Sequence, residues 1–192
     1  MRQISERFWA EGYQATGISE LEEVTGLARP RLYAAFGSKQ QMLHGAIDFY
    51  LAQRVDRLFA GVDDAGIEGV VGFFRRFAMI NREQPQRAAM GCLMVNSIVE
   101  IGQSDPGVMA RAERYRTRVR QSFGSALQRA HDDGDIDGEV AQRADLAYIM
   151  LMGLYVTIKG GAAPGDIQQL CQLAIATVES WRSRPKPATA GL

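Results

Sequence analysis

The chain has 192 residues, of which 46% are hydrophobic and 23% are charged, and its formal net charge is zero. A chain of this length and composition buries enough apolar surface to fold without metal or disulfide support, which excludes the disordered and disulfide-stapled classes. Zero net charge argues neither for nor against nucleic acid, because a DNA-binding surface is a local feature.

The cysteines and the ends of the chain indicate the compartment. Cys92 and Cys171 match neither a metal-ligand spacing nor a disulfide framework, which fits a reducing interior. The first residues, MRQISERFWAEG, are charged and lack the apolar region of a secretory signal. The longest uncharged apolar stretch, residues 146–158, is too short to cross a bilayer. We therefore expect a cytoplasmic protein with no membrane partner, no metal and no other cofactor.

Apolar residues recur at helical spacing along the whole chain, and no stretch shows the sustained alternation that is typical of strands. Capping boxes at Ser38 and Asp166, and Asp105 directly before Pro106, mark three helix starts. The sequence therefore predicts an all-α fold. Its nine expected helices cover residues 2–11, 18–25, 29–35, 38–58, 66–82, 87–102, 106–132, 139–160 and 166–182.

Residues 17–36, GISELEEVTGLARPRLYAAF, have the spacing of a helix-turn-helix. Leu21 belongs to the inner face of the first helix, and Leu32 and Phe36 form that of the second. Gly26 allows the left-handed corner between the helices because it has no Cβ atom. Two short core helices with solvated arginines remain the alternative when spacing alone is considered.

The second of these helices carries outward-facing groups suited to DNA. Arginine pairs with guanine through two hydrogen bonds, which gives about 1–3 kcal/mol of discrimination. Arg29 and Arg31 are therefore the expected base-reading residues, with Tyr33 beside them. Lys39, at the start of the next helix, suits a phosphate. From Val24 to Ile47 the chain has three basic residues and no acidic one.

A longer pattern encloses this motif. An aromatic residue, a G-[YF]-x-x-[TS] element, a spaced L…G pair and an L-Y-x-x-F-x-[SGD]-K-x-x-L run follow at fixed offsets within residues 8–43. This pattern resembles the DNA-binding domain of the TetR/AcrR family of transcriptional regulators. The matching residues are Phe8, Gly12, Tyr13, Thr16, Leu21, Gly26, Leu32, Tyr33, Phe36, Ser38, Lys39 and Leu43. Residues 91–100 and the last two helices also resemble the family, so the resemblance covers essentially the whole chain.

The resemblance implies a homodimer that binds palindromic, double-stranded operator DNA with residues 29–35 in the major groove. It implies phosphate contacts by Tyr33 and Lys39 and a DNA-backbone contact by Thr16. We expect Glu22 and Glu23 to face solvent. Because only seven residues precede Phe8, we expect the family's basic N-terminal arm to be shortened or absent here. The predicted DNA-binding residues are Thr16, Gly17, Ala28, Arg29, Pro30, Arg31, Tyr33, Ala34 and Lys39.

The resemblance also implies an effector pocket in the later helices, where polar residues interrupt apolar stretches. The predicted pocket residues are Phe77, Cys92, Asn96, Glu100, Tyr115 and Tyr155. For each of them, ordinary core packing is the alternative. Cys92 opens a predicted helix, where a thiolate would be reactive. A buried, inert thiol is the reading of Cys92 that we favour.

The last two long helices are candidates for a dimer interface. A helix that is apolar on all sides, as residues 147–156 are, must be covered on all sides. Two such helices can pair with their copies as a four-helix interface, with intramolecular core packing as the alternative. The predicted interface residues are Tyr148, Leu151, Leu170, Leu173, Val178 and Trp181.

The sequence thus predicts a ligand-responsive regulator, by family default a repressor that a small-molecule inducer of unknown identity releases from DNA. We expect a DNA-binding domain over 1–45, a ligand-binding and dimerisation domain over 46–184 and a flexible tail over 185–192. A helical ligand-binding or redox-sensing module with weak or no DNA binding is the alternative. No catalytic residues are predicted, because His44 and His131 lie outside metal-type spacings and no nucleophile elbow or phosphate loop occurs.

Overall fold

The structure, a computed structural model, describes residues 1–183, and the predicted tail at 185–192 lies outside them. Within the described range the fold is all-α, as predicted, and its only strand-like pairing is one antiparallel bridge between Ile136 and Arg182. Among residues 1–183, nine α-helices have eight residues or more, and two have four. The helices are α1 (Arg2–Glu11), α2 (Ile18–Thr25), α3 (Arg29–Phe36), α4 (Lys39–Tyr50), α5 (Asp56–Phe59), α6 (Gly66–Glu83), α7 (Pro85–Ala88), α8 (Leu93–Ile101), α9 (Pro106–Asp132), α10 (Val140–Lys159) and α11 (Pro164–Glu179).

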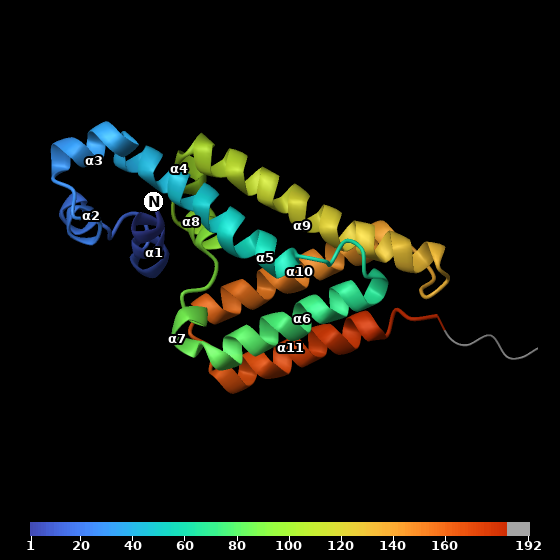
Figure 1. Ribbon diagram of the computed structural model, residues 1–192. Helices are drawn as coiled ribbons and strands as arrows, with labels where there is room; N and C mark the ends of the chain where they lie inside the picture. Colours follow the sequence, from blue (N-terminus) through green and yellow to red (C-terminus); the bar gives the residue numbers. More distant parts are fainter. Residues whose placement is uncertain (184–192) are drawn as a thin grey trace, which may run out of the picture.

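Helices α1, α2 and α3 gather at one end of the molecule, and we call them the head (Figure 1). Apolar residues from these helices and from α4, which include Phe8, Leu21, Leu32 and Leu43, are almost fully buried. Gly26 ends α2 in the left-handed conformation, with φ of 68°, and its N–H donates to the Glu22 carbonyl oxygen. The predicted helix-turn-helix is therefore formed.

One continuous helical segment leads from the head into the rest of the chain (Figure 1). Its start confirms the first capping box, because Ser38 Oγ accepts the Gln41 N–H at 3.2 Å and Gln41 Oε1 accepts the Ser38 N–H at 2.8 Å. The segment is not a regular α-helix throughout. A π-helical turn, η1 (Leu51–Val55), separates α4 from α5. π-turns are rare, occur mostly as single turns inside α-helices and are frequent at functional sites.

The remaining long helices form the body of the molecule, in which α6, α9, α10 and α11 pack as a bundle and α8 lies toward the head. Aromatic packing holds its centre: the Phe73 ring lies 4.5 Å from that of Phe59 and 5.1 Å from that of Phe123. Asp105 caps α9 as predicted, by accepting the N–H groups of Gly107 and Val108. No helix within residues 1–183 is long and apolar enough to span a membrane.

Two predicted boundaries were wrong. The helix expected over 87–102 is split into the single turn α7 and the helix α8, because Gly91 takes a positive φ of 70° between them. The helix expected to start at Asp166 begins at Pro164, a residue whose fixed φ suits a first helical turn. Asp166 therefore lies inside the first turn, and Ala163 occupies the N-cap position.

Candidate functional site

Helix α3 presents to solvent the residues that were expected to read DNA. Leu32 is fully buried and anchors the helix, whereas Tyr33 on the other face is 40% exposed. Arg31 forms no hydrogen bond or ion pair with any residue in 1–183, so its guanidinium is free to contact a partner. The exposed members of the predicted set are Ala28, Arg29, Pro30, Arg31, Tyr33 and Ala34.

The first turn of α3 is capped from the neighbouring helix. Ala28 is the N-cap residue of α3, and its side chain has no atom that could accept a hydrogen bond from the free N–H groups of this turn. The carboxylate of Glu22 on α2 accepts the Arg29 N–H at 2.6 Å instead, and its other oxygen lies 3.5 Å from the Arg29 guanidinium. The expectation that Glu22 simply faces solvent was wrong, while Glu23 is exposed as expected. This contact fixes the start of α3 against α2.

The corner between α1 and α2 is held by polar contacts. Thr16 is fully buried and its hydroxyl donates to the Gly12 carbonyl oxygen at 2.7 Å, so its side chain is turned away from any DNA surface. Half-buried Gly17 donates its N–H to the Glu20 carboxylate, and this hydrogen bond, with one from Arg7, lowers the pKa of Glu20. The predicted DNA-backbone contact by the Thr16 side chain is therefore not supported.

Lys39 begins α4 beside the helix-turn-helix. Its ammonium nitrogen lies 4.5 Å from the centre of the Tyr13 ring, in cation–π contact, and its side chain stays half-buried. At this position the Lys39 ammonium group lies next to the first turn of α4, where free N–H groups also point outward. The arrangement suits contact with a phosphate.

Glu100 joins the head to the body and was missed in that role. It was predicted to line the effector pocket, and its two carboxylate oxygens accept the N–H groups of Tyr13 at 2.9 Å and Gln14 at 2.7 Å, directly after α1. Asn96, one turn earlier on α8, donates to the Met90 carbonyl oxygen at 2.8 Å. Both residues line a groove between α8 and the end of α10, and their assignment to the effector pocket stays a prediction.

A second connection runs from α4 to the start of α9. Asp105 accepts hydrogen bonds at 3.0 Å from Gln40 Nε2 and lies 3.0 Å from His44 Nε2. Burial opposes ionisation of Asp105, but these hydrogen bonds outweigh it and lower the pKa of the carboxyl group. Further along, Arg111 on α9 contacts Asp48 on α4 at 2.7 Å. α4 is thereby clamped along one side to α9.

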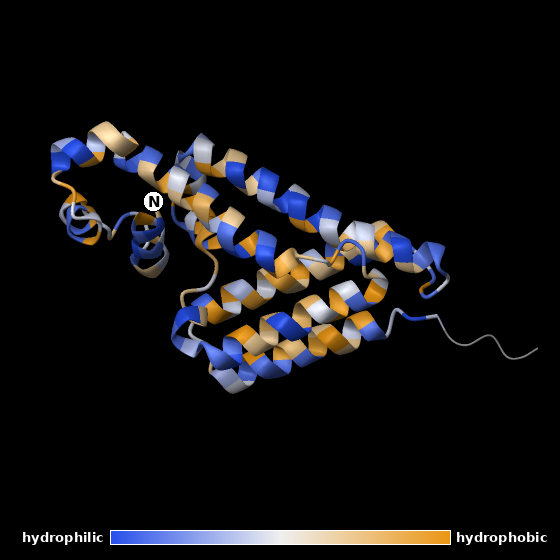
Figure 2. Cartoon of the chain, viewed as in Figure 1, coloured by the Kyte–Doolittle hydropathy of each residue, from blue (hydrophilic) through white to orange (hydrophobic). Residues whose placement is uncertain are grey.

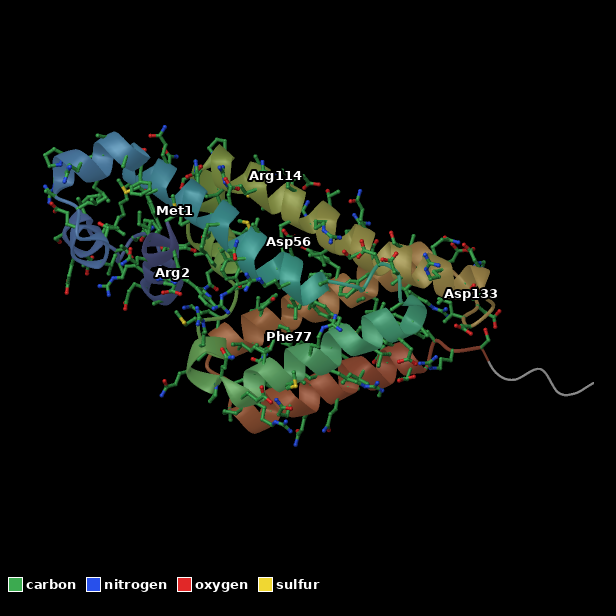
Figure 3. The ribbon with its side chains drawn as sticks, in the orientation of Figure 1. Met1, Arg2, Asp56, Phe77, Arg114 and Asp133 are labelled. Carbon is green, nitrogen blue, oxygen red and sulfur yellow. The ribbon has the colours of Figure 1, made fainter. Side chains whose placement is uncertain are left out.

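A cavity of about 100 Å³ opens beside the π-turn. That volume is below the roughly 300–1,000 Å³ of typical small-molecule sites, so a ligand must be small or must displace lining side chains. Phe77 and Tyr155, both predicted pocket residues, line it with their ring centres 5.3 Å apart (Figure 3 labels Phe77 on α6). The full lining is Trp9, Tyr50, Arg54, Val55, Leu58, Phe77, Ile80, Asn81, Gln84, Arg87, Ala88, Gly91, Tyr155 and Ile158.

The head itself contributes a wall of this cavity. Trp9 of α1 donates its indole N–H to the Gly91 carbonyl oxygen at 3.0 Å, and its ring meets that of Tyr50 edge-on at 5.2 Å. The sequence reasoning missed Trp9, Tyr50, Arg54 and Arg87. One signal was present: Phe8 and Trp9 are consecutive and therefore point to different sides of α1, so the head core uses only one of them.

Cys92 and Tyr115 do not line the cavity, although both were predicted to do so. Cys92 is fully buried and opens α8, next to the buried hydroxyl groups of Tyr50, Tyr115 and Tyr155. Burial raises the pKa of the Cys92 thiol. Because the thiolate is the reactive form, a buried, protonated thiol is a poor target for oxidants. The geometry therefore favours the inert reading of Cys92.

Helices α10 and α11 expose apolar side chains on the outside of the body. Figure 2 shows apolar positions along the outer helix α11 among polar ones. Ile149 on α10 is 61% exposed and Leu173 on α11 is 63% exposed. Tyr148 is half-buried. The large exposed apolar residues of the two helices are Leu146, Ile149, Val156, Leu170 and Leu173, of which Leu170 and Leu173 were predicted.

Three of the predicted interface residues were assigned wrongly. Leu151 and Val178 are fully buried, and Trp181 is nearly so, within the core of their own chain. They therefore have no surface to offer to a second copy. The prediction failed because α10 is apolar on nearly every side, and such a pattern does not reveal which side faces outward.

Known proteins that are similar in sequence to this chain are helix-turn-helix regulators. Residues 3–46 match the family model described as bacterial regulatory proteins, tetR family. The chain is 25% identical over 185 residues to the HTH-type transcriptional repressor ComR of Escherichia coli (strain K12), covering 91% of this chain and 83% of that protein. It is 28% identical over 144 residues to the uncharacterized HTH-type transcriptional regulator YezE of Bacillus subtilis (strain 168), covering 74% and 73% respectively.

Solved structures agree with these relatives. A cysteine mutant of the TetR family transcriptional regulator CifR, in complex with 26-base-pair operator DNA, superposes with a TM-score of 0.77 at 25% identity, over 91% of this chain and 92% of that one. A TetR family regulator from Cytophaga hutchinsonii shares the fold with a TM-score of 0.82 at 13% identity, over 95% and 92%. The helix-turn-helix therefore lies in the segment that matches the tetR family model, and the whole fold is similar to that of TetR family transcriptional regulators.

Proposed function

We propose that the chain is a homodimeric repressor that binds a palindromic operator through α3 and leaves it when a small molecule fills the cavity beside Trp9. One observation carries the proposal: α3 turns Arg29, Arg31 and Tyr33 outward while Leu32 anchors the helix in the head core. The likeness to CifR, whose structure contains operator DNA, supports it. In this proposal, residues 1–45 bind DNA and residues 46–184 bind the effector and the second copy.

The exposed apolar side chains of α10 and α11 support the homodimer, because an uncovered apolar face of this kind is typical of an interaction surface. A symmetric pair presents two α3 helices. These must lie about 34–36 Å apart, or a multiple of it, to enter successive major grooves. An effector releases DNA if it binds more tightly to a dimer whose two α3 helices are spaced wrongly for successive major grooves. α4 is suited to transmit the change, since it runs from Lys39 beside the head to the π-turn beside the cavity.

The decisive experiment is a fluorescence anisotropy titration of the chain with labelled duplex DNA from the region upstream of its own gene. We expect saturable binding that weakens steeply as salt rises, because phosphate contacts release counterions. Arg31→Ala should weaken specific binding by about 10- to 100-fold, the loss expected of one bidentate base contact. Arg82→Ala is the matched control, since Arg82 is a 71% exposed arginine on α6, far from α3 in the chain.

Tyr33→Ala gives a second, independent reading of the same surface. We expect it to weaken binding to specific and unrelated duplexes alike, because its role is to position the helix on the backbone. If specific binding survived both Arg31→Ala and Tyr33→Ala at wild-type strength, α3 would not be the recognition helix.

A further inference from the structure

Two guanidinium groups face the Trp9 ring at the mouth of the cavity. The Arg54 guanidinium carbon lies 4.6 Å from the ring centre and that of Arg87 lies 5.4 Å from it. Arg87 is paired with Glu6 at 3.0 Å. Arg54 is half-buried, yet within residues 1–183 it has no hydrogen-bond or ion-pair partner. Glu6, the carboxylate that acts on Arg54 at this mouth, is already paired with Arg87, so a half-buried guanidinium without an ion pair of its own favours a further anion beside it.

The surroundings of Arg54 increase this demand. Burial lowers its pKa, and the neighbouring charge of Arg87 lowers it further. The charged residues around the wider mouth are Arg2, Glu6, Arg54, Arg57, Arg76 and Arg87, five cations against one carboxylate. Such a mouth attracts anions and repels cations.

The interior of the cavity has the opposite character. Below the arginines it is lined mainly by aliphatic and aromatic side chains, among them Phe77, Ile80 and Ile158. The side-chain N–H₂ of Asn81 is already used, because it donates to the Phe77 carbonyl oxygen at 2.8 Å. A ligand that fits must therefore combine a charged end with an apolar end.

The position of Arg54 in the fold connects this site with the head. Arg54 belongs to the π-turn, the one irregular turn in the segment between the head and the body. Its partner surface, Trp9, belongs to α1 of the head and is tied to the body through Gly91. A ligand held between Arg54 and Trp9 therefore touches both parts of the molecule.

We propose that the effector is a small amphipathic carboxylic acid. Its carboxylate binds Arg54 and Arg87 at the edge of Trp9, and its apolar end packs against the contacting rings of Phe77 and Tyr155. A carboxylate supplies a further negative charge beside the Arg54 guanidinium, and its planar shape matches the guanidinium fork. The inference rests on the proposed function only in taking this cavity as the effector site.

The test compares three probes that differ only at one end: 3-phenylpropanoate, 3-phenylpropanol and 3-phenylpropylamine. Each is titrated calorimetrically into the full chain without DNA. The fluorescence of a Trp181→Phe variant, in which Trp9 is the only tryptophan, gives a second readout at the site itself. We expect the acid to bind at least about tenfold more tightly than the alcohol and to change the Trp9 emission, with the amine weakest. Equal binding of acid and alcohol, or no binding of the acid, would overturn the proposal.

Variants locate the contact. Arg54→Gln should weaken the acid by about 10- to 100-fold and leave the alcohol unchanged, since one charge-assisted interaction is lost. Arg54→Lys keeps the positive charge but lacks the planar guanidinium fork. Its affinity for the acid should therefore lie between those of the wild type and of Arg54→Gln. Arg57→Gln is the matched control, because Arg57 lies three residues away, is exposed and donates to Gln53 at the mouth. An equal loss in Arg57→Gln and Arg54→Gln would mean that the general field, and not this contact, selects the acid.

The two proposals fail separately. The binding test contains no DNA, so an absence of operator binding would refute the proposed function and leave the selectivity for the acid intact. Release of operator DNA by the alcohol as effectively as by the acid would refute the assigned ligand class and leave the repressor proposal standing. Circular dichroism melting of each variant verifies that a lost signal is not lost folding.

Discussion

Glu100→Ala removes the contact that ties α8 of the body to the end of α1. The carboxylate accepts two backbone N–H groups, from Tyr13 at 2.9 Å and from Gln14 at 2.7 Å. The Gln14 N–H is exposed and can turn to water, whereas the Tyr13 N–H is partly buried and would lose its partner. An unsatisfied buried donor costs about 1–3 kcal/mol, and the lost charge-assisted bond at Gln14 adds less because water replaces it. We expect a total loss of about 2–3 kcal/mol in unfolding free energy.

For a chain of this size, such a loss corresponds to a melting temperature lower by about 4–12 °C. Urea titration followed by circular dichroism and thermal melting measure the two quantities. Glu11→Ala is the matched control, because Glu11 lies on α1 beside the same groove and makes only a 4.0 Å contact with Arg7. An exposed pair of this kind contributes less than about 1 kcal/mol. A Glu100→Ala curve that coincides with that of Glu11→Ala would refute the role given to Glu100.

Three further outcomes are expected. Ile149→Glu places a charge on the exposed face of α10 and should shift the chain toward monomer in sedimentation velocity, whereas Leu151→Ala, in the buried core, should cost about 2–5 kcal/mol of stability instead. Because the folded-state pKa of Asp105 is lowered, its contribution is present above the ordinary carboxyl pKa and is lost as pH falls through the folded value. Urea unfolding across acidic pH should therefore show a shallower loss for Asp105→Asn, and parallel curves would contradict this. The Cys92 thiol should resist iodoacetamide at neutral pH until urea unfolds the chain, and rapid labelling of the native protein would revive the redox-sensing alternative.

Local signals in the sequence predicted local structure well. The capping box at Ser38 and the cap at Asp105 depend on residues within three positions of one another, and both are formed as expected. The turn at Gly26 is of the same kind, because its left-handed φ is required where the corner lies. The exposed side of α3 also followed from spacing, since burial of Leu32 places Arg31 and Tyr33 outward.

The cavity could not be predicted in this way, because its parts come from distant segments. Trp9 meets Gly91 across 82 positions of the chain, and Glu100 meets Tyr13 across 87. Helical periodicity specifies which residues share a face but not which helix covers that face. The π-turn at residues 51–55 could not be recognised from the sequence either, because the apolar residues on both sides of it keep their helical spacing. The residues missed at the site therefore depend on tertiary packing.

The attachments of the head indicate how a small ligand could act on a distant DNA surface. The contacts that hold the head end of the chain to the body include Glu100 to the end of α1, Trp9 to Gly91, Arg87 to Glu6, and Asp105 to α4. Coupling between two sites usually amounts to about 1–3 kcal/mol, or about 5- to 150-fold in affinity. That is the size of a single charge-assisted hydrogen bond. An effector therefore needs to rearrange only one of these attachments, and those made by Trp9 and Arg87 border the cavity.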